Sequence, residues 1–103
     1  VVFGASDDTT LNGGVAVDFV YDRGSFELGN GADTITLSNA AGVLDSVSYN
    51  DEEYPDLKGH SLSLSPDMMS ATDNDTGANW CAASSAMASG DLGTPGAAND
   101  ACQ

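Results

Sequence analysis

Basic side chains are what this sequence lacks most. Arg23 and Lys58 are the only two, against 16 aspartates and glutamates, and the net charge is −14. Such a charge repels the phosphates of nucleic acids and the headgroups of anionic membranes, so both are excluded as partners. It keeps a protein soluble and attracts cations, and salt or calcium in the medium would screen its self-repulsion.

Long apolar runs are absent as well. No stretch approaches the roughly 18 apolar residues of a membrane-spanning helix. The chain has 103 residues, and we expect residues 1–103 to form a single domain. It opens on Val1–Gly4 without Met or a signal peptide, which resembles the interior of a strand. We therefore expect it to be part of a longer protein or a processed product.

Cysteine is scarce, since Cys81 and Cys102 are the only two, and two are enough for one disulfide. In a short, turn-rich chain two cysteines favour a disulfide and an oxidising compartment, here extracellular or at the cell surface. The bridge is expected to stabilise the fold by roughly 3.4 kcal/mol. Free thiols are one alternative, and a metal site is the less favoured one, because the chain has one histidine and no Cys-x-x-Cys motif.

Apolar residues alternate with a period of two, which is the pattern of half-buried β-strands. Turn residues separate the runs, and this spacing is typical of a β-sandwich or barrel. No segment shows the amphipathic stripe of a helix. Thr94–Ala97 predicts a type II turn with Gly96 at its third position. The predicted strands are Val15–Tyr21, Phe26–Leu28, Ile35–Leu37, Val43–Tyr49 and Leu62–Leu64.

Asp45 is the exception to this pattern, because alternation places it on the same face as Val43, Val47 and Tyr49. A carboxylate on a core face needs hydrogen-bond donors or an opposite charge. The simpler interpretation is that Asp45 lies near a strand end and accepts backbone N–H bonds. The alternative is a functional carboxylate.

Six short motifs follow one another in a defined order. They are Asn30, Gly31 and Asp33 before Thr34–Leu37; Gly42 before Val43–Tyr49; Gly59 and Ser61 before Leu62; Asn79 before Trp80; Gly93, Thr94, Pro95 and Gly96; and Asn99. In this order they resemble the lamin tail domain family in its bacterial, secreted form. The resemblance covers roughly residues 28–99. It implies an all-β, immunoglobulin-like β-sandwich that serves as a non-catalytic interaction or adhesion module of a larger secreted or surface protein.

The resemblance also implies that the N-terminal strands of the family domain are missing. Family members usually begin with a strand, an acidic Glu-Trp-Ile-Glu-type strand and a Leu-Ser-Gly-Trp turn, and none of these occurs here. An absent strand leaves exposed edges. The gap would be filled by another chain, by a homodimer that shares unpaired strands, or by a rearrangement of Val1–Gly4 and Val15–Tyr21.

In this family the Trp region and the Gly-Thr-Pro-Gly turn close the sandwich. The resemblance therefore assigns Trp80 to the core, where its large ring would exclude water. A Cys81–Cys102 bridge would then tie the last segment to the strand that carries Trp80. The alternative for Trp80 is an exposed ring that stacks on a sugar.

Catalytic residues are not expected. His60 is the only histidine, and the sequence around it lacks the Gly-x-Ser-x-Gly pattern of a nucleophile elbow. Paired carboxylates for glycoside hydrolysis are not singled out either, and a chain this short has little room for a substrate cleft. We therefore expect a protein that is not an enzyme.

Two acidic loops are candidate cation sites. Asp73-Asn74-Asp75-Thr76-Gly77 resembles a calcium loop, but Gly77 falls at the fifth position and no glutamate closes the loop. An irregular calcium site at Asp73 and Asp75 remains an alternative to a solvated turn. The second loop carries Asp51, Glu52, Glu53 and Asp56. It is expected to be a solvated loop, and the alternatives are a calcium site or a docking patch for a basic partner.

These loops define the second functional hypothesis, a calcium-assisted carbohydrate-binding module. It would use one acidic loop and an exposed aromatic ring from Tyr49, Tyr54 or Trp80. The expected partner is thus a protein under the first hypothesis and a cell-surface glycan under the second. No cofactor other than calcium is implied.

Overall fold

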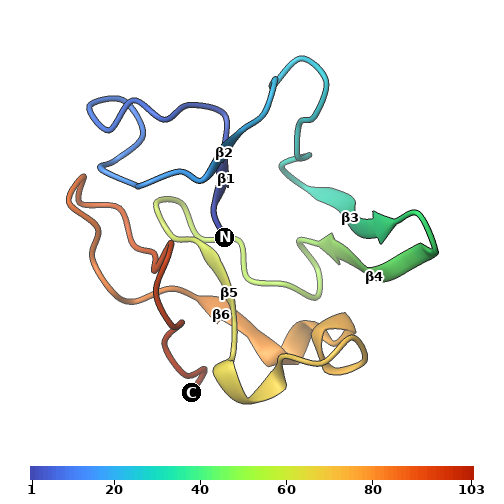
Figure 1. Cartoon of the computed structure of the whole chain (residues 1–103). Helices are drawn as coiled ribbons and strands as arrows, with labels where there is room; N and C mark the ends of the chain where they lie inside the picture. The colour runs from blue at the N-terminus through green and yellow to red at the C-terminus, as the bar shows by residue number, and fades with distance from the viewer.

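The fold, described here by a computed structural model of residues 1–103, is β-rich and contains three two-stranded sheets (Figure 1). One sheet pairs β1 with β2 in parallel, and the other two pair β3 with β4 and β5 with β6 in antiparallel orientation. The strands are β1 (Phe3–Gly4), β2 (Phe19–Val20), β3 (Ala32–Asn39), β4 (Gly42–Asn50), β5 (Leu62–Leu64) and β6 (Trp80–Ala82).

No α-helix is present, in agreement with the sequence pattern. Three single turns of 3₁₀-helix lie between β5 and β6. They are η1 (Pro66–Met68), η2 (Asp73–Asp75) and η3 (Gly77–Asn79). Each is too short for an apolar periodicity to develop, which is why the sequence pattern does not reveal it.

The β3–β4 hairpin has one polar and one apolar face. Thr34 and Thr36 each share a hydrogen bond with the serine hydroxyl opposite, at 2.7 Å to Ser48 and 2.9 Å to Ser46. Because side chains alternate along a strand, Ile35 of β3 lies on the other face, with Leu37, Val47 and Tyr49. The predicted strands Ile35–Leu37 and Val43–Tyr49 are confirmed, since they lie within β3 and β4.

A β-bulge changes the expected position of Val43. Leu37 pairs with Asp45, but the next residue, Ser38, pairs with Val43, so that Leu44 has no partner in β3. Directly paired residues share a face of the sheet. Val43 therefore lies on the polar face with Ser38, and the prediction that it shares a face with Asp45 is wrong. The inserted residue shifts the alternation by one.

The N-terminal segment contains much less strand than the sequence predicted. Of Val15–Tyr21 only Phe19–Val20 forms a strand, and Phe26–Leu28 forms none. The Asn12 side chain bonds both the N–H and the carbonyl of Val15, and the Asp18 carboxylate accepts the N–H of Val2. Such side-chain bonds compete with a strand ladder.

The C-terminal segment is fastened back onto β5 and β6. The disulfide joins Cys81 of β6 to Cys102, with their Cα atoms 5.5 Å apart. The predicted turn at Thr94–Ala97 is present, since the Ala97 N–H bonds the Thr94 carbonyl at 3.0 Å and Gly96 has φ +78°. The Asn99 amide then donates to the carbonyl of Leu64 at 2.9 Å.

The core is small and lies around β5 and β6. Only five residues are buried, and Tyr54 is the single large one. The others are Ser63, Ser65, Ala83 and Gly93. Most large apolar side chains consequently remain accessible, including those on the apolar face of the β3–β4 hairpin.

Candidate functional site

An apolar cleft of about 460 Å³ lies where the β3–β4 hairpin faces β5 and β6. Its walls come from segments that are distant in sequence, and seven of the eight lining residues are hydrophobic. Ile35 and Leu37 are 43% and 59% exposed, so the cleft is open to solvent. The lining residues are Leu28, Ile35, Leu37, Asp45, Val47, Tyr49, Leu62 and Trp80.

A second depression of about 490 Å³ continues the cleft toward the N-terminal segment and shares Leu28, Ile35 and Leu37 with it. Its other apolar residues are the aromatic Phe3, Tyr21 and Phe26. The rings of Tyr21 and Phe26 meet edge to face, with their centroids 5.3 Å apart. Apolar patches that extend this far on a small protein are commonly interaction surfaces.

Trp80 forms part of the cleft wall, and Asn74 and Tyr54 contact its side chain. Its indole N–H donates to the Asn74 carbonyl at 2.8 Å, and its ring lies 6.0 Å from that of Tyr54. Trp80 is half-buried, so one part packs on the small core while another faces the cleft. Tyr54 is only 5% exposed, and the expectation that it offers an exposed ring is wrong.

Asp45 is the one charged residue in the lining of the cleft. Its carboxylate accepts the N–H of Ser46 at 2.8 Å, as expected, and also the side-chain amide of Asn74, although Asp45 lies within β4 and not near a strand end. No cation lies beside it, because the only ion pair in the protein joins Arg23 and Glu27 on the surface. The carboxylate therefore enters the cleft half-buried and electrostatically uncompensated.

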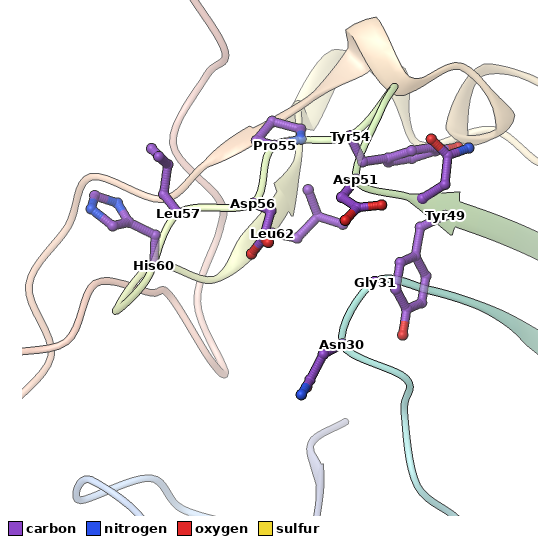
Figure 2. Close-up of a pocket in the computed structure, with 11 residues that line it drawn as sticks. Asn30, Gly31, Tyr49, Asp51, Tyr54, Pro55, Asp56, Leu57, His60 and Leu62 are labelled. Atoms are coloured by element: carbon purple, nitrogen blue, oxygen red, sulfur yellow. The ribbon is translucent and has the colours of Figure 1, made fainter.

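A smaller polar pocket of about 130 Å³ lies beside the Asp51–Asp56 loop (Figure 2). Tyr49 and Asn30 stand at one end and Leu57 and His60 at the other, and His60 does not point at Asp51. The imidazole Nδ1 bonds the Ala83 carbonyl at 2.8 Å, and no serine or carboxylate bonds the ring. This geometry offers no nucleophile activated by a base.

The two tyrosines near these sites, Tyr49 and Tyr54, both have a raised pKa. Burial raises the pKa of Tyr49, and the nearby charge of Asp33 raises it further. Burial likewise raises the pKa of Tyr54, and the negative charges of Asp75 and Glu53 raise it further. Both phenols therefore stay neutral at physiological pH. The Tyr49 hydroxyl donates to the Gly29 carbonyl at 2.6 Å and fixes the turn before β3.

The motif residues of the sequence fall mainly at turns and close contacts. The N–H groups of Gly29 and then Thr34 bond the Asp33 carboxylate and hold its pKa below the usual value. A Cβ on Gly93 would meet the Ser61 hydroxyl at 2.5 Å, so these two motifs touch. Asn30 and Gly31 line the polar pocket, Gly59 takes φ +79°, and the Thr94 hydroxyl bonds Asn99.

The acidic loops do not converge. No group of three or more histidine, cysteine, aspartate or glutamate side chains is arranged to hold a metal ion. Asp73 accepts the Ser70 hydroxyl at 2.7 Å, while Asp75 offers its carbonyl to Tyr54. Asp51, Glu52, Glu53 and Asp56 are all exposed. A calcium site built from few side chains and several carbonyls remains a sequence-based prediction.

The sequence did not reveal the cleft itself. Alternation identifies the apolar face of Ile35 and Leu37, and the same pattern is expected whether or not that face is covered.

No helix in the protein has the length and apolarity needed to cross a membrane. The chain matches no family model, and no curated protein or solved structure is significantly similar to it.

Proposed function

We propose that the chain is a non-catalytic extracellular interaction module and that its apolar cleft receives an extended segment of a partner protein. The observation that carries this proposal is the open cleft, into which Ile35 and Leu37 project from β3 with much of their surface accessible. Covering such side chains releases water and supplies about 25 cal/mol for each Å² of apolar surface buried.

The free edge of β3 favours an extended segment over a helix. The Asp51 N–H bonds the Gly31 carbonyl, so the odd-numbered residues of β3 bond to β4 and the even-numbered ones face away. The backbone groups of Thr36 consequently have no partner, and Thr36 lies at the edge of the second depression. An added strand would bond such groups and place alternate side chains in the cleft.

The lamin tail resemblance fits this proposal, and we keep it as the proposed family. Three two-stranded sheets with free edges resemble parts of a sandwich whose remaining strands come from elsewhere, and the finer expectation of an immunoglobulin-like sandwich belongs to this proposal. The disulfide supports an extracellular or cell-surface location, because disulfides persist in oxidising compartments. Adhesion is the role that the resemblance implies.

The carbohydrate-binding alternative has less support. Tyr54 is buried, and the other two candidate rings, Tyr49 and Trp80, line the apolar cleft and are half-buried. The two acidic loops form no convergent set of carboxylates. No observation favours a sugar over an apolar segment of polypeptide.

The test is a binding titration with a short blocked peptide of alternating valine and threonine that contains no tryptophan. Trp80 is the only tryptophan and lines the cleft, so its fluorescence reports occupancy. We expect saturable binding that Ile35→Gln weakens by about tenfold or more, since one buried aliphatic side chain is worth about 1.5–3 kcal/mol.

Thr34→Gln is the matched control, because it places the same side chain on the opposite face of β3. Circular dichroism would show that both variants keep the fold. We expect the control to bind like the parent. Absence of binding, or equal loss in both variants, would overturn the proposal of a cleft-based interaction module.

A further inference from the structure

The uncompensated carboxylate of Asp45 restricts what the cleft can bind. We infer that the segment received there carries a lysine or arginine that pairs with Asp45 and is flanked by apolar residues. This inference rests on the proposed function and specifies its partner. It thus identifies a cationic, apolar strand as the chemical class of the occupant.

The first step is the cost of covering Asp45. The residue shares the cleft lining with Ile35, Leu37 and Val47, and none of the protein's own basic groups pairs with it. An entirely apolar segment would bury this charge without an opposite charge beside it, which is unfavourable. A segment with a basic side chain at this position would remove the cost and add a charge-assisted hydrogen bond.

The second step is that Asp45 is held in position before any partner arrives. One oxygen accepts the Ser46 N–H and the other accepts the Asn74 amide, which leaves further acceptor sites on a carboxylate. Asn74 is fixed in turn, because its backbone carbonyl accepts the Trp80 indole N–H. The Asn74 carbonyl Oδ1 is buried without a partner, so bonding to Asp45 determines how the amide points.

Charge makes a second copy of the chain an unfavourable occupant of the cleft. Each copy carries a net charge of −14, and its two basic residues, Arg23 and Lys58, lie outside the cleft lining. Two such molecules repel each other at moderate ionic strength, whereas a cationic segment is attracted toward the site. The charge of the whole molecule and the charge inside the cleft therefore favour the same partner chemistry.

The experiment uses three blocked peptides that share the alternating valine–threonine sequence and differ at one central position on the valine face. That position holds lysine, norleucine or glutamate. Calorimetric titration should show that the lysine peptide binds about tenfold or more tightly than the norleucine peptide, and that the glutamate peptide binds most weakly. The comparison among peptides needs no protein variant, so it does not depend on how a variant folds.

Asp45→Asn should abolish the preference for lysine while retaining binding of the norleucine peptide. Asp51→Asn is the matched control, because it removes one exposed acidic charge outside the cleft. We expect this control to keep the preference. Loss of the preference in both variants would show a general charge effect and overturn the pairing with Asp45.

The outcomes separate this inference from the proposed function. Equal binding of the lysine and norleucine peptides would overturn the inference and leave the interaction module intact. Failure of all three peptides to bind would overturn both. Sedimentation velocity without peptide is run in parallel, and a dimer whose formation blocks the peptides would identify a second copy as the occupant and overturn the inference.

Discussion

Gly77 illustrates how single residues determine the packing behind the cleft. A Cβ at this position would clash with the Glu53 carbonyl oxygen and lie 2.9 Å from the Glu53 carbonyl carbon. The close approach of these two backbones brings Tyr54 beneath η2, where its hydroxyl donates to the Asp75 carbonyl at 3.2 Å. Tyr54 in turn supports Trp80, so a change at Gly77 would reach the cleft through two side chains.

Gly77→Ala is therefore expected to destabilise the protein by about 1–3 kcal/mol, because the backbone of Glu53 must move. Gly24→Ala is the control, since the nearest atom to its Cβ would be a carboxylate oxygen of Asp22 at an ordinary 3.4 Å. It should change the free energy of unfolding by less than about 0.5 kcal/mol. Urea denaturation followed by Trp80 fluorescence measures both, and equal effects would contradict this description of the packing.

Among the elements, the C-terminal segment depends on one carboxylate in addition to the disulfide. Asp100 accepts bonds from the hydroxyls of Ser84 and Ser85, at 2.9 Å each, and from both of their N–H groups. The serine hydroxyls, and then the Ser84 N–H, lower the pKa of Asp100 below its ordinary value of 3.8. The stabilising contribution of the ionised group is thus present above that value and is lost as the pH falls through the lower pKa of the folded state.

Asp100→Asn should lower the melting temperature at neutral pH, because a neutral amide replaces a carboxylate that accepts four hydrogen bonds. The difference from the parent should shrink as the pH falls from 3.8 through the lower pKa of the folded state, where the parent's own Asp100 becomes protonated. Thermal melts recorded by circular dichroism between acidic and neutral pH provide the measurement. A difference that stays constant across this range would show that the ionisation of Asp100 does not matter.

The elements also show how far the sequence could predict the structure. Thr34 to Leu37 alternate cleanly and form β3, and Pro95-Gly96 determines its turn through backbone preferences that are local. Phe26 to Leu28 alternate as well but form no strand, and the N–H groups of Ser25 and Phe26 bond the Asp22 carbonyl in a turn that ends at Phe26. Local patterns succeed where no nearby polar side chain or carbonyl competes for the backbone.

The site was less predictable than the strands. Alternation along the strand places the charged Asp45 on an apolar face, which identified it as a residue of interest. Its hydrogen bond from the Ser46 N–H was also expected. Its bond to Asn74, 29 positions away, depends on how η2 packs against β4, and no local signal encodes that contact. The bulge at Leu44 likewise follows from the pairing of β3 with β4 as a whole.

At the scale of the whole molecule, a small core and a large negative charge oppose each other. Only five residues are buried, while the charge of −14 favours expansion through self-repulsion. Salt should consequently stabilise the protein by screening. A melting temperature that rises steadily with sodium chloride is the expected result, and one that falls would show that attractive ion pairs dominate.

A partner in the cleft would relieve both problems at once. It would cover Ile35 and Leu37, which extends the apolar core, and a basic side chain would lower the net charge beside Asp45. Ligands that bind the folded state alone raise stability through mass action. The molecule thus has a small core around β5 and β6 and an exposed apolar face on β3 and β4.

The most direct test of this description is a map of amide chemical shifts in the isotope-labelled protein during titration with the lysine peptide. We expect the largest changes at Ile35 to Leu37, at Asp45 to Val47 and at the indole N–H of Trp80. The acidic loop from Asp51 to Asp56 should change little. Changes confined to that loop and His60, with the cleft residues unchanged, would show that the peptide does not bind in the cleft.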